Sequence, residues 1–169
     1  QRALRAGGLG RGDAVVAFTA NVPAAVVLLL ACAGLGVRFA TCSPDFGAAA
    51  AYARFAQLRP KALFASCGYW YGGRWFDTGE VVTDLAGRLA RVASSDDGAA
   101  LSSAAPSGTA LTSAARPDVT LPVIALPYPG SDAKVPAVTT PWHQWLKAGS
   151  EPDAASTEDD QAAEAPTLL

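Results

Sequence analysis

The chain has 169 residues, a length that suits one domain, and half of them are hydrophobic, so it can form a buried core. Thirteen basic and fifteen acidic side chains give a net charge of −2, yet six of the acids and no basic residue follow Lys147. The part before residue 151 therefore carries about +4, without the basic, aromatic-interleaved patch that nucleic-acid binding needs, so we expect no nucleic-acid partner.

The first six residues have the composition of a helix end, and Gly7 and Gly8 supply the usual stop signal that follows a helix. The first residue is a glutamine, and the chain contains no methionine. We therefore interpret the sequence as a fragment of a longer protein.

Residues 14–37 form a run without charged side chains, and this run is long enough to cross a bilayer. A small membrane protein is therefore one alternative. Pro23 argues against a single helix here, because it lacks an amide hydrogen and disfavours helical geometry in the residue before it. We instead predict a helix that begins at Pro23 with Asn21 as its cap and ends at 34–36. Buried strands over 14–19 and 37–41 would flank it, so we expect no membrane partner.

The next segment repeats this alternation. Ser43 is a candidate cap, residues 48–59 have apolar side chains near one helical face, and Lys61–Ser66 has the composition of a third strand. We predict a loop over 67–75, rich in glycine and aromatic residues. Asp77 and Glu80 have the spacing of a capping box before a helix over 81–92.

This order of elements predicts an α/β fold, with a parallel β-sheet and flanking helices. Val119–Leu126 is a fourth strand candidate, and Trp142–Leu146 is a short helix candidate. We expect four segments: a βαβ-type core, a low-complexity insertion, a further strand and short helix of the same domain, and an acidic flexible tail. Their bounds are residues 1–93, 94–117, 118–147 and 148–169.

The cysteine and histidine residues form no recognisable reactive motif. Cys32, Cys42 and Cys67 match no zinc spacing, and we interpret them as free thiols of a protein in a reducing cytoplasm. His143 is the only histidine, and Lys147, one helical turn away, would oppose its protonation. We therefore predict no metal site and no catalytic residue in this chain.

The loop Gly68–Arg74 is the segment that we expect to contact a ligand. It follows a predicted strand on the carboxyl side, where open α/β sheets bind ligands. Its glycines permit close backbone approach, its aromatic rings can stack on a base, and Arg74 can pair with a phosphate. Ordinary loop packing is the alternative interpretation of the same composition.

A set of motifs in the first half of the chain resembles a known family. Cys42–Gly47 (CSPDFG), Arg54–Gln57 (RFAQ), Pro60–Ala65 (PKALFA) and Gly68–Arg74 (GYWYGGR) occur in this order. Together they resemble the N-terminal domain of acetoacetyl-CoA synthetases, within the adenylate-forming acyl-CoA ligases. Related synthetases usually have arginine and lysine where this chain has Trp70 and Arg74. The fold that this implies is an incomplete part of the large N-terminal domain of such a ligase.

The resemblance implies an ATP-dependent ligase that activates acetoacetate or a similar short acid through an acyl-adenylate. Pyrophosphate leaves, and the thiol of coenzyme A then displaces AMP; ATP, coenzyme A and Mg²⁺ are the implied cofactors. In acetyl-CoA synthetases the equivalent loop contacts coenzyme A through two arginines, at positions that fall on Tyr71 and Arg74. The implied cofactor-binding residues are therefore Tyr71, Gly72, Gly73 and Arg74.

The family's ATP-binding and catalytic motifs lie downstream of the residues that match. We therefore expect the 169-residue fragment to be inactive alone and to bind none of these cofactors tightly. A noncatalytic remnant that binds a nucleotide or a partner is the alternative function.

Overall fold

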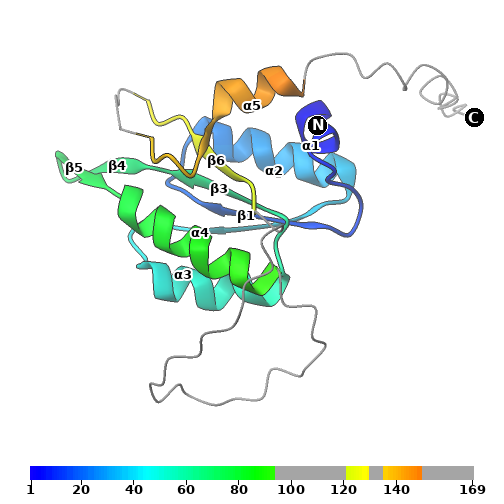
Figure 1. The fold of residues 1–169 in the computed structure, drawn as a ribbon. Coiled ribbons are helices and arrows are strands. Elements are labelled where there is room, and N and C mark those ends of the chain that lie inside the picture. The colour runs from blue at the N-terminus through cyan, green and yellow to red at the C-terminus, as the bar shows by residue number, and fades with distance from the viewer. Residues whose placement is uncertain (94–120, 130–134, 150–169) are drawn as a thin grey trace, which may run out of the picture.

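The computed structural model describes residues 1–93, 121–129 and 135–149, and these residues form a five-stranded parallel sheet with helices on both faces (Figure 1). The strand order is β2-β1-β3-β6-β7. The strands are β1 (Ala14–Phe18), β2 (Arg38–Cys42), β3 (Ala62–Ser66), β6 (Val123–Leu126) and β7 (Thr140–Pro141). The α/β fold with a parallel sheet and flanking helices is thus confirmed, and β7 is an addition to the predicted strands.

Strand β1 occupies the interior of the sheet, with β2 on one side and β3 on the other. Val16, at its centre, lies opposite Ala40 of β2 and Leu63 of β3, and both pairings are parallel. All five side chains of β1 are buried, because helices cover both faces of the sheet. This explains why its sequence is continuously apolar rather than alternating.

Two hydrophobic clusters lie on opposite faces of the sheet. On one face pack α1 (Arg2–Ala6), α2 (Pro23–Leu35) and α5 (Trp142–Ala148), where Trp142 and Trp145 place their rings edge-on against Phe64. On the other face pack α3 (Ala48–Phe55), a 3₁₀ turn (Ala56–Leu58) and α4 (Gly79–Ala93). The first half of the chain therefore supplies most of both layers.

Helix α2 resolves the choice between a buried βαβ unit and a membrane span. It begins at Pro23 and ends at Leu35, where Gly36 adopts a left-handed conformation with φ of 67°, which favours glycine. The expected strand, helix and strand are therefore all present. No helix in the described parts of the chain has the length and apolar character needed to cross a membrane.

The three predicted caps do not occupy the positions that precede their helices. Val22, not Asn21, precedes α2, and it is extended because a residue before proline avoids helical geometry. Gly47, not Ser43, precedes α3, because residues 43–46 form a turn in which the amide of Phe46 donates to the carbonyl of Ser43. Thr78, not Asp77, precedes α4, although the carboxylate of Asp77 accepts a hydrogen bond from the amide of Gly79, the first residue of the helix (2.7 Å).

The loop predicted over 67–75 is a β-hairpin. Strands β4 (Gly68–Tyr71) and β5 (Arg74–Asp77) pair antiparallel and form a separate two-stranded sheet. The insertion predicted over 94–117 and most of the tail predicted over 148–169 lie outside the described residues. The four-segment division of the chain stays a prediction.

An ion pair joins the loops that lead into β1 and β3. Lys61 Nζ lies 2.7 Å from Asp13 Oδ1, and the amide of Gly10 donates to Asp13 Oδ2 at 2.9 Å. The hydrogen bond from Lys61 is the main cause that lowers the pKa of Asp13 below its ordinary value of 3.8, and the bond from Gly10 adds to it. Asp13 therefore stabilises the fold in its charged form.

We predict that Asp13→Asn lowers the free energy of unfolding by about 1 kcal/mol at pH 7, the size of one such hydrogen bond. Because the folded-state pKa is lowered, the wild-type advantage is complete above the ordinary value of 3.8 and is lost as the pH falls through the folded value. Urea unfolding from pH 7 down to about pH 2.5, below the ordinary range of an aspartate, measures this.

Asp84→Asn is the control for this measurement, since Asp84 pairs with Arg88 one turn away on α4, with both side chains exposed. Its effect should be a few tenths of a kcal/mol. Equal stability of Asp13→Asn and wild type at pH 7 would contradict a stabilising role for this pair.

Candidate functional site

The strand order reverses direction between β1 and β3. The chain passes from β1 to β2 on one side, then crosses to β3 on the other side of β1. The connections that leave the carboxyl ends of β1 and β3 therefore diverge, and open α/β sheets bind ligands in such a crevice. Thr19 and Ser66 lie at these two strand ends, where their buried hydroxyl oxygens are 2.7 Å apart and hydrogen-bonded.

A groove of about 520 Å³ opens at this edge of the sheet. We call it the switch-point groove. It combines hydroxyl, amide and carboxylate side chains on one side with three aromatic side chains on the other. The residues that line it are Thr19, Ala20, Asn21, Thr41, Ser43, Pro44, Asp45, Tyr69, Trp70 and Tyr71.

The aromatic side of the groove belongs to the β4–β5 hairpin. Gly72 and Gly73 form its two-residue turn with φ of 54° and 73°, a conformation of the kind that glycine pairs supply in hairpins. Tyr69 stacks on Phe76 with ring centroids 5.4 Å apart, and Trp70 meets Trp75 edge-on at 5.7 Å. These cross-strand ring pairs stiffen the hairpin.

The hairpin is also fixed to the main sheet. The hydroxyl of Tyr128, two residues past β6, accepts a hydrogen bond from the amide of Trp70 at 3.2 Å. The ring of Tyr128 packs edge-on against Trp75, with centroids 5.7 Å apart. The buried hydroxyl of Thr78 donates to the carbonyl of Ser66 at 2.7 Å, at the base of the hairpin. The hairpin therefore extends from the sheet in a defined direction.

The four residues expected to bind a cofactor all lie at the tip of this hairpin. Tyr71 lines the switch-point groove and is 74% exposed. Arg74 pairs with it across the hairpin and is not among the residues that line the groove. Its guanidinium carbon lies 5.8 Å from the ring centroid of Phe76, and the side chain faces solvent. Gly72 and Gly73 connect the two strands.

Sequence reasoning missed the polar side of the groove. The sequence alone predicts Asn21 and Ser43 to be helix caps and indicates no role for Thr19, Thr41 and Asp45. The available signal was their position, since each lies at or just after the end of a predicted parallel strand. The carboxyl ends of parallel strands meet at one edge of the sheet, which brings these residues together.

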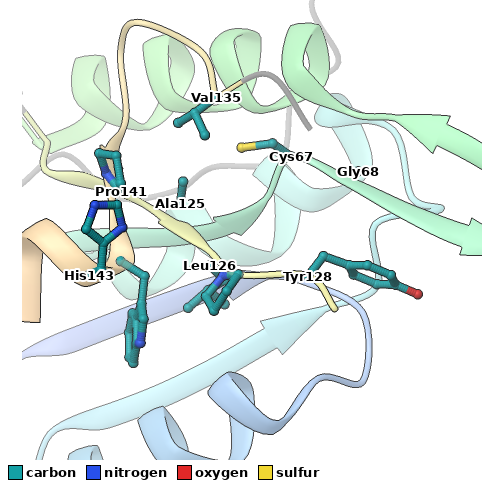
Figure 2. Close-up of a pocket in the computed structure, with 10 residues that line it drawn as sticks. Cys67, Gly68, Ala125, Leu126, Tyr128, Val135, Pro141 and His143 are labelled. Atoms are coloured by element: carbon teal, nitrogen blue, oxygen red, sulfur yellow. The ribbon is translucent and has the colours of Figure 1, made fainter. Parts of the chain in front are cut away.

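A second cavity, of about 260 Å³, lies between β6, the start of the hairpin and α5 (Figure 2). Cys67 and His143 both line it, although 76 positions separate them in the sequence. Burial raises the pKa of the Cys67 thiol to about 11, so the nucleophilic thiolate is scarce at neutral pH. The rest of the lining is largely apolar, which makes this cavity a gap in packing rather than a reactive site.

The other two thiols are similar. Cys32 lies on the buried side of α2, where burial raises its pKa to about 11, and burial also raises the pKa of Cys42. Within the described residues, no group of three histidine, cysteine, aspartate or glutamate side chains could hold a metal ion.

The family model for AMP-binding enzymes matches residues 2–162. The chain belongs to this family. A segment of 89 residues is 43% identical to the acetoacetyl-coenzyme A synthetase of Rhizobium meliloti, covering 53% of this chain and 14% of that protein. A segment of 72 residues is 38% identical to the acetoacetyl-CoA synthetase of Mus musculus, covering 43% of this chain and 11% of that protein.

Solved structures agree with the family assignment. The structure of an acetoacetyl-CoA synthetase from Streptomyces lividans superposes with a TM-score of 0.61 at 31% sequence identity. The superposition covers 87% of this chain and 18% of that one. The chain thus spans a small part of the length of the relatives that it matches.

We predict that all three cysteines react slowly with a thiol reagent in the folded protein. A pKa of about 11 instead of 9.0 leaves roughly a hundredfold less thiolate on Cys32 and Cys67 at neutral pH, and the side chains are also shielded. Labelling with iodoacetamide at pH 7.5 should be near zero in buffer and reach three thiols in 6 M guanidinium. Rapid native labelling of Cys67 would contradict its assignment to packing.

Proposed function

We propose that this chain is part of an AMP-forming acid–thiol ligase that activates acetoacetate or a similar short acid to its coenzyme A thioester. Its family membership and its partial identity to acetoacetyl-CoA synthetases support this. In such a reaction ATP adenylates the acid with release of pyrophosphate, and coenzyme A then displaces AMP. We assign no described residue to ATP, to Mg²⁺ or to the acid.

We further propose that the hairpin tip and the switch-point groove contribute to the coenzyme A site. The observation that carries this is the position of the hairpin: it extends from the carboxyl end of β3, beside the crevice where the strand order reverses. Tyr71, Gly72, Gly73 and Arg74 are the proposed contacts. The glycines leave the backbone accessible, and nothing lies within 4 Å of where a Cβ of either would be.

The charges in this region favour one orientation of such a ligand. Arg74 is the cation of the hairpin tip, and a guanidinium binds phosphate oxygens with charge-assisted hydrogen bonds. Asp45 lies in the groove and would repel a phosphate there. We therefore expect the phosphates at Arg74, while the aromatic rings and hydroxyl groups of the groove face the nucleoside.

We predict that Arg74→Ala weakens the use of coenzyme A by about ten- to a hundredfold. The basis is the loss of a charge-assisted hydrogen bond worth roughly 1.5–3 kcal/mol, where about 1.4 kcal/mol is a factor of ten. The measurement is thioester formation by a full-length ligase that carries this segment. ATP–pyrophosphate exchange, which does not involve coenzyme A, should change little.

Arg88→Ala is the matched control, because Arg88 is an arginine on α4 whose side chain is 40% exposed and pairs with Asp84. It should leave both half-reactions unchanged. If Arg74→Ala lowers pyrophosphate exchange as much as thioester formation, Arg74 has a structural role and the proposed assignment is wrong.

A further inference from the structure

The β4–β5 hairpin projects from the carboxyl end of β3 and extends past the end of the main sheet (Figure 1). A two-stranded hairpin without further support is at best marginally stable in water. Its tip nevertheless carries Tyr71 and Arg74, which pair with each other across the two strands. The contacts that hold the hairpin against the sheet therefore determine where these two side chains lie.

Tyr128 provides two of these contacts, and both reach the residue pair next to the tip. Trp70 and Trp75 lie opposite each other, one step before the tip pair Tyr71–Arg74. The hydroxyl of Tyr128 accepts the hydrogen bond from the amide of Trp70 at 3.2 Å, and its ring packs edge-on against Trp75. One side chain thus contacts both strands of the hairpin, so that a tilt of the hairpin would break both contacts.

The position of Trp70 in the ladder explains why its amide is available for this bond. In an antiparallel pair of strands, opposite residues alternate between those that exchange backbone hydrogen bonds and those that do not. The pair Tyr71–Arg74 closes the turn and is of the first kind. The amide of Trp70, in the next pair, therefore faces away from β5, and Tyr128 lies on that side.

Trp75 is also fixed at the base of its own hairpin. A Cβ atom on Gly68 would collide with the indole ring of Trp75, so glycine at this position allows the ring to lie across the start of β4. The same indole ring packs edge-on against Tyr128, with ring centroids 5.7 Å apart. Trp75 therefore joins the base of the hairpin to the segment that follows β6.

Tyr128 is itself held in a defined position. It lies two residues past β6, which pairs in parallel with β3, the strand from which the hairpin extends. Pro127 and Pro129 flank it, and each proline fixes its own φ and restricts the residue before it. Its half-buried ring packs against the hydrophobic cluster that contains Phe64 and Ile124. The orientation of the hairpin is thus tied to two neighbouring strands of the main sheet.

We propose that Tyr128 is a positioning residue of the coenzyme A site. It orients the hairpin so that Tyr71 and Arg74 face the same ligand as the switch-point groove. This inference rests on the proposed function of the hairpin tip. Tyr128 is not among the residues that line the groove, so it acts through Trp70 and Trp75 and not by touching the ligand.

Hydrogen exchange in the 169-residue chain, read residue by residue by NMR, tests the contact itself. Tyr128→Phe removes only the hydroxyl, so it should speed exchange of the Trp70 amide about two- to tenfold, the range of one hydrogen bond. Amides of β1 should exchange as in wild type. Tyr52→Phe is the matched control, because Tyr52 is a half-buried tyrosine of α3 on the opposite face of the sheet. It should leave exchange of the Trp70 amide unchanged.

Kinetics of a full-length ligase that carries this segment test the role in binding. Tyr128→Ala should raise KM for coenzyme A about tenfold or more, because the hydrogen bond and the ring contact are both lost. ATP–pyrophosphate exchange should change little, and Tyr52→Ala should leave KM for coenzyme A near that of wild type. Tyr128→Phe, which keeps the ring, should raise KM less, and it provides the same test if Tyr128→Ala does not fold.

Combination with Arg74→Ala tests whether Tyr128 acts through the tip. Changes that affect one interaction are not independent, whereas those of separate sites usually add in free energy. The double variant should therefore lose less than the product of the two single losses in the use of coenzyme A.

Three results would overturn the inference and leave the coenzyme A proposal intact. They are unchanged exchange of the Trp70 amide in Tyr128→Phe, equal losses of thioester formation and pyrophosphate exchange in Tyr128→Ala, and losses that multiply fully with those of Arg74→Ala. A different result would overturn the proposed function of the hairpin tip and with it the role of Tyr128. That result is faster exchange of the Trp70 amide while Tyr128→Ala and Arg74→Ala both use coenzyme A as wild type does.

Discussion

The position of β1 between two parallel neighbours is the constraint on which the rest of the structure depends. Parallel strands require crossover connections, and here these run through helices that cover the two faces of the sheet. Because both neighbours of β1 are reached this way, the chain must leave β2 and pass to the far side of β1. That single reversal produces the crevice at the carboxyl edge. The buried hydrogen bond between Thr19 and Ser66 links its two margins without closing it.

Much of this could be predicted from the sequence, because the signals are local. Strand β1 is five consecutive apolar residues, α2 begins at a proline, and Gly36 supplies the left-handed stop. The prediction of the cap of α2 was wrong because a neighbouring residue determines the backbone conformation there. Val22 is extended because Pro23 follows it, so the helix begins too late for Asn21 to cap it.

The hairpin and the groove could not be predicted to the same degree, because pairing between distant segments determines them. Gly72 and Gly73 are a recognisable turn signal, yet the aromatic residues around them show no alternation of polar and apolar types. The groove brings together residues from three connections. Their convergence follows only from the strand order, which no local pattern specifies.

The uncharged run over residues 14–37, which has the length of a membrane span, also explains why the exposed surface of α2 is apolar. Periodicity could not assign an inner face to this helix, because its residues are apolar in every direction. Pro23 and Gly36 restrict it to 13 residues, and the sheet then buries Ala24, Leu28 and Cys32 while Val26 and Leu30 remain exposed. The packing against the sheet therefore decides which side of this helix is buried, because the sequence of the helix does not.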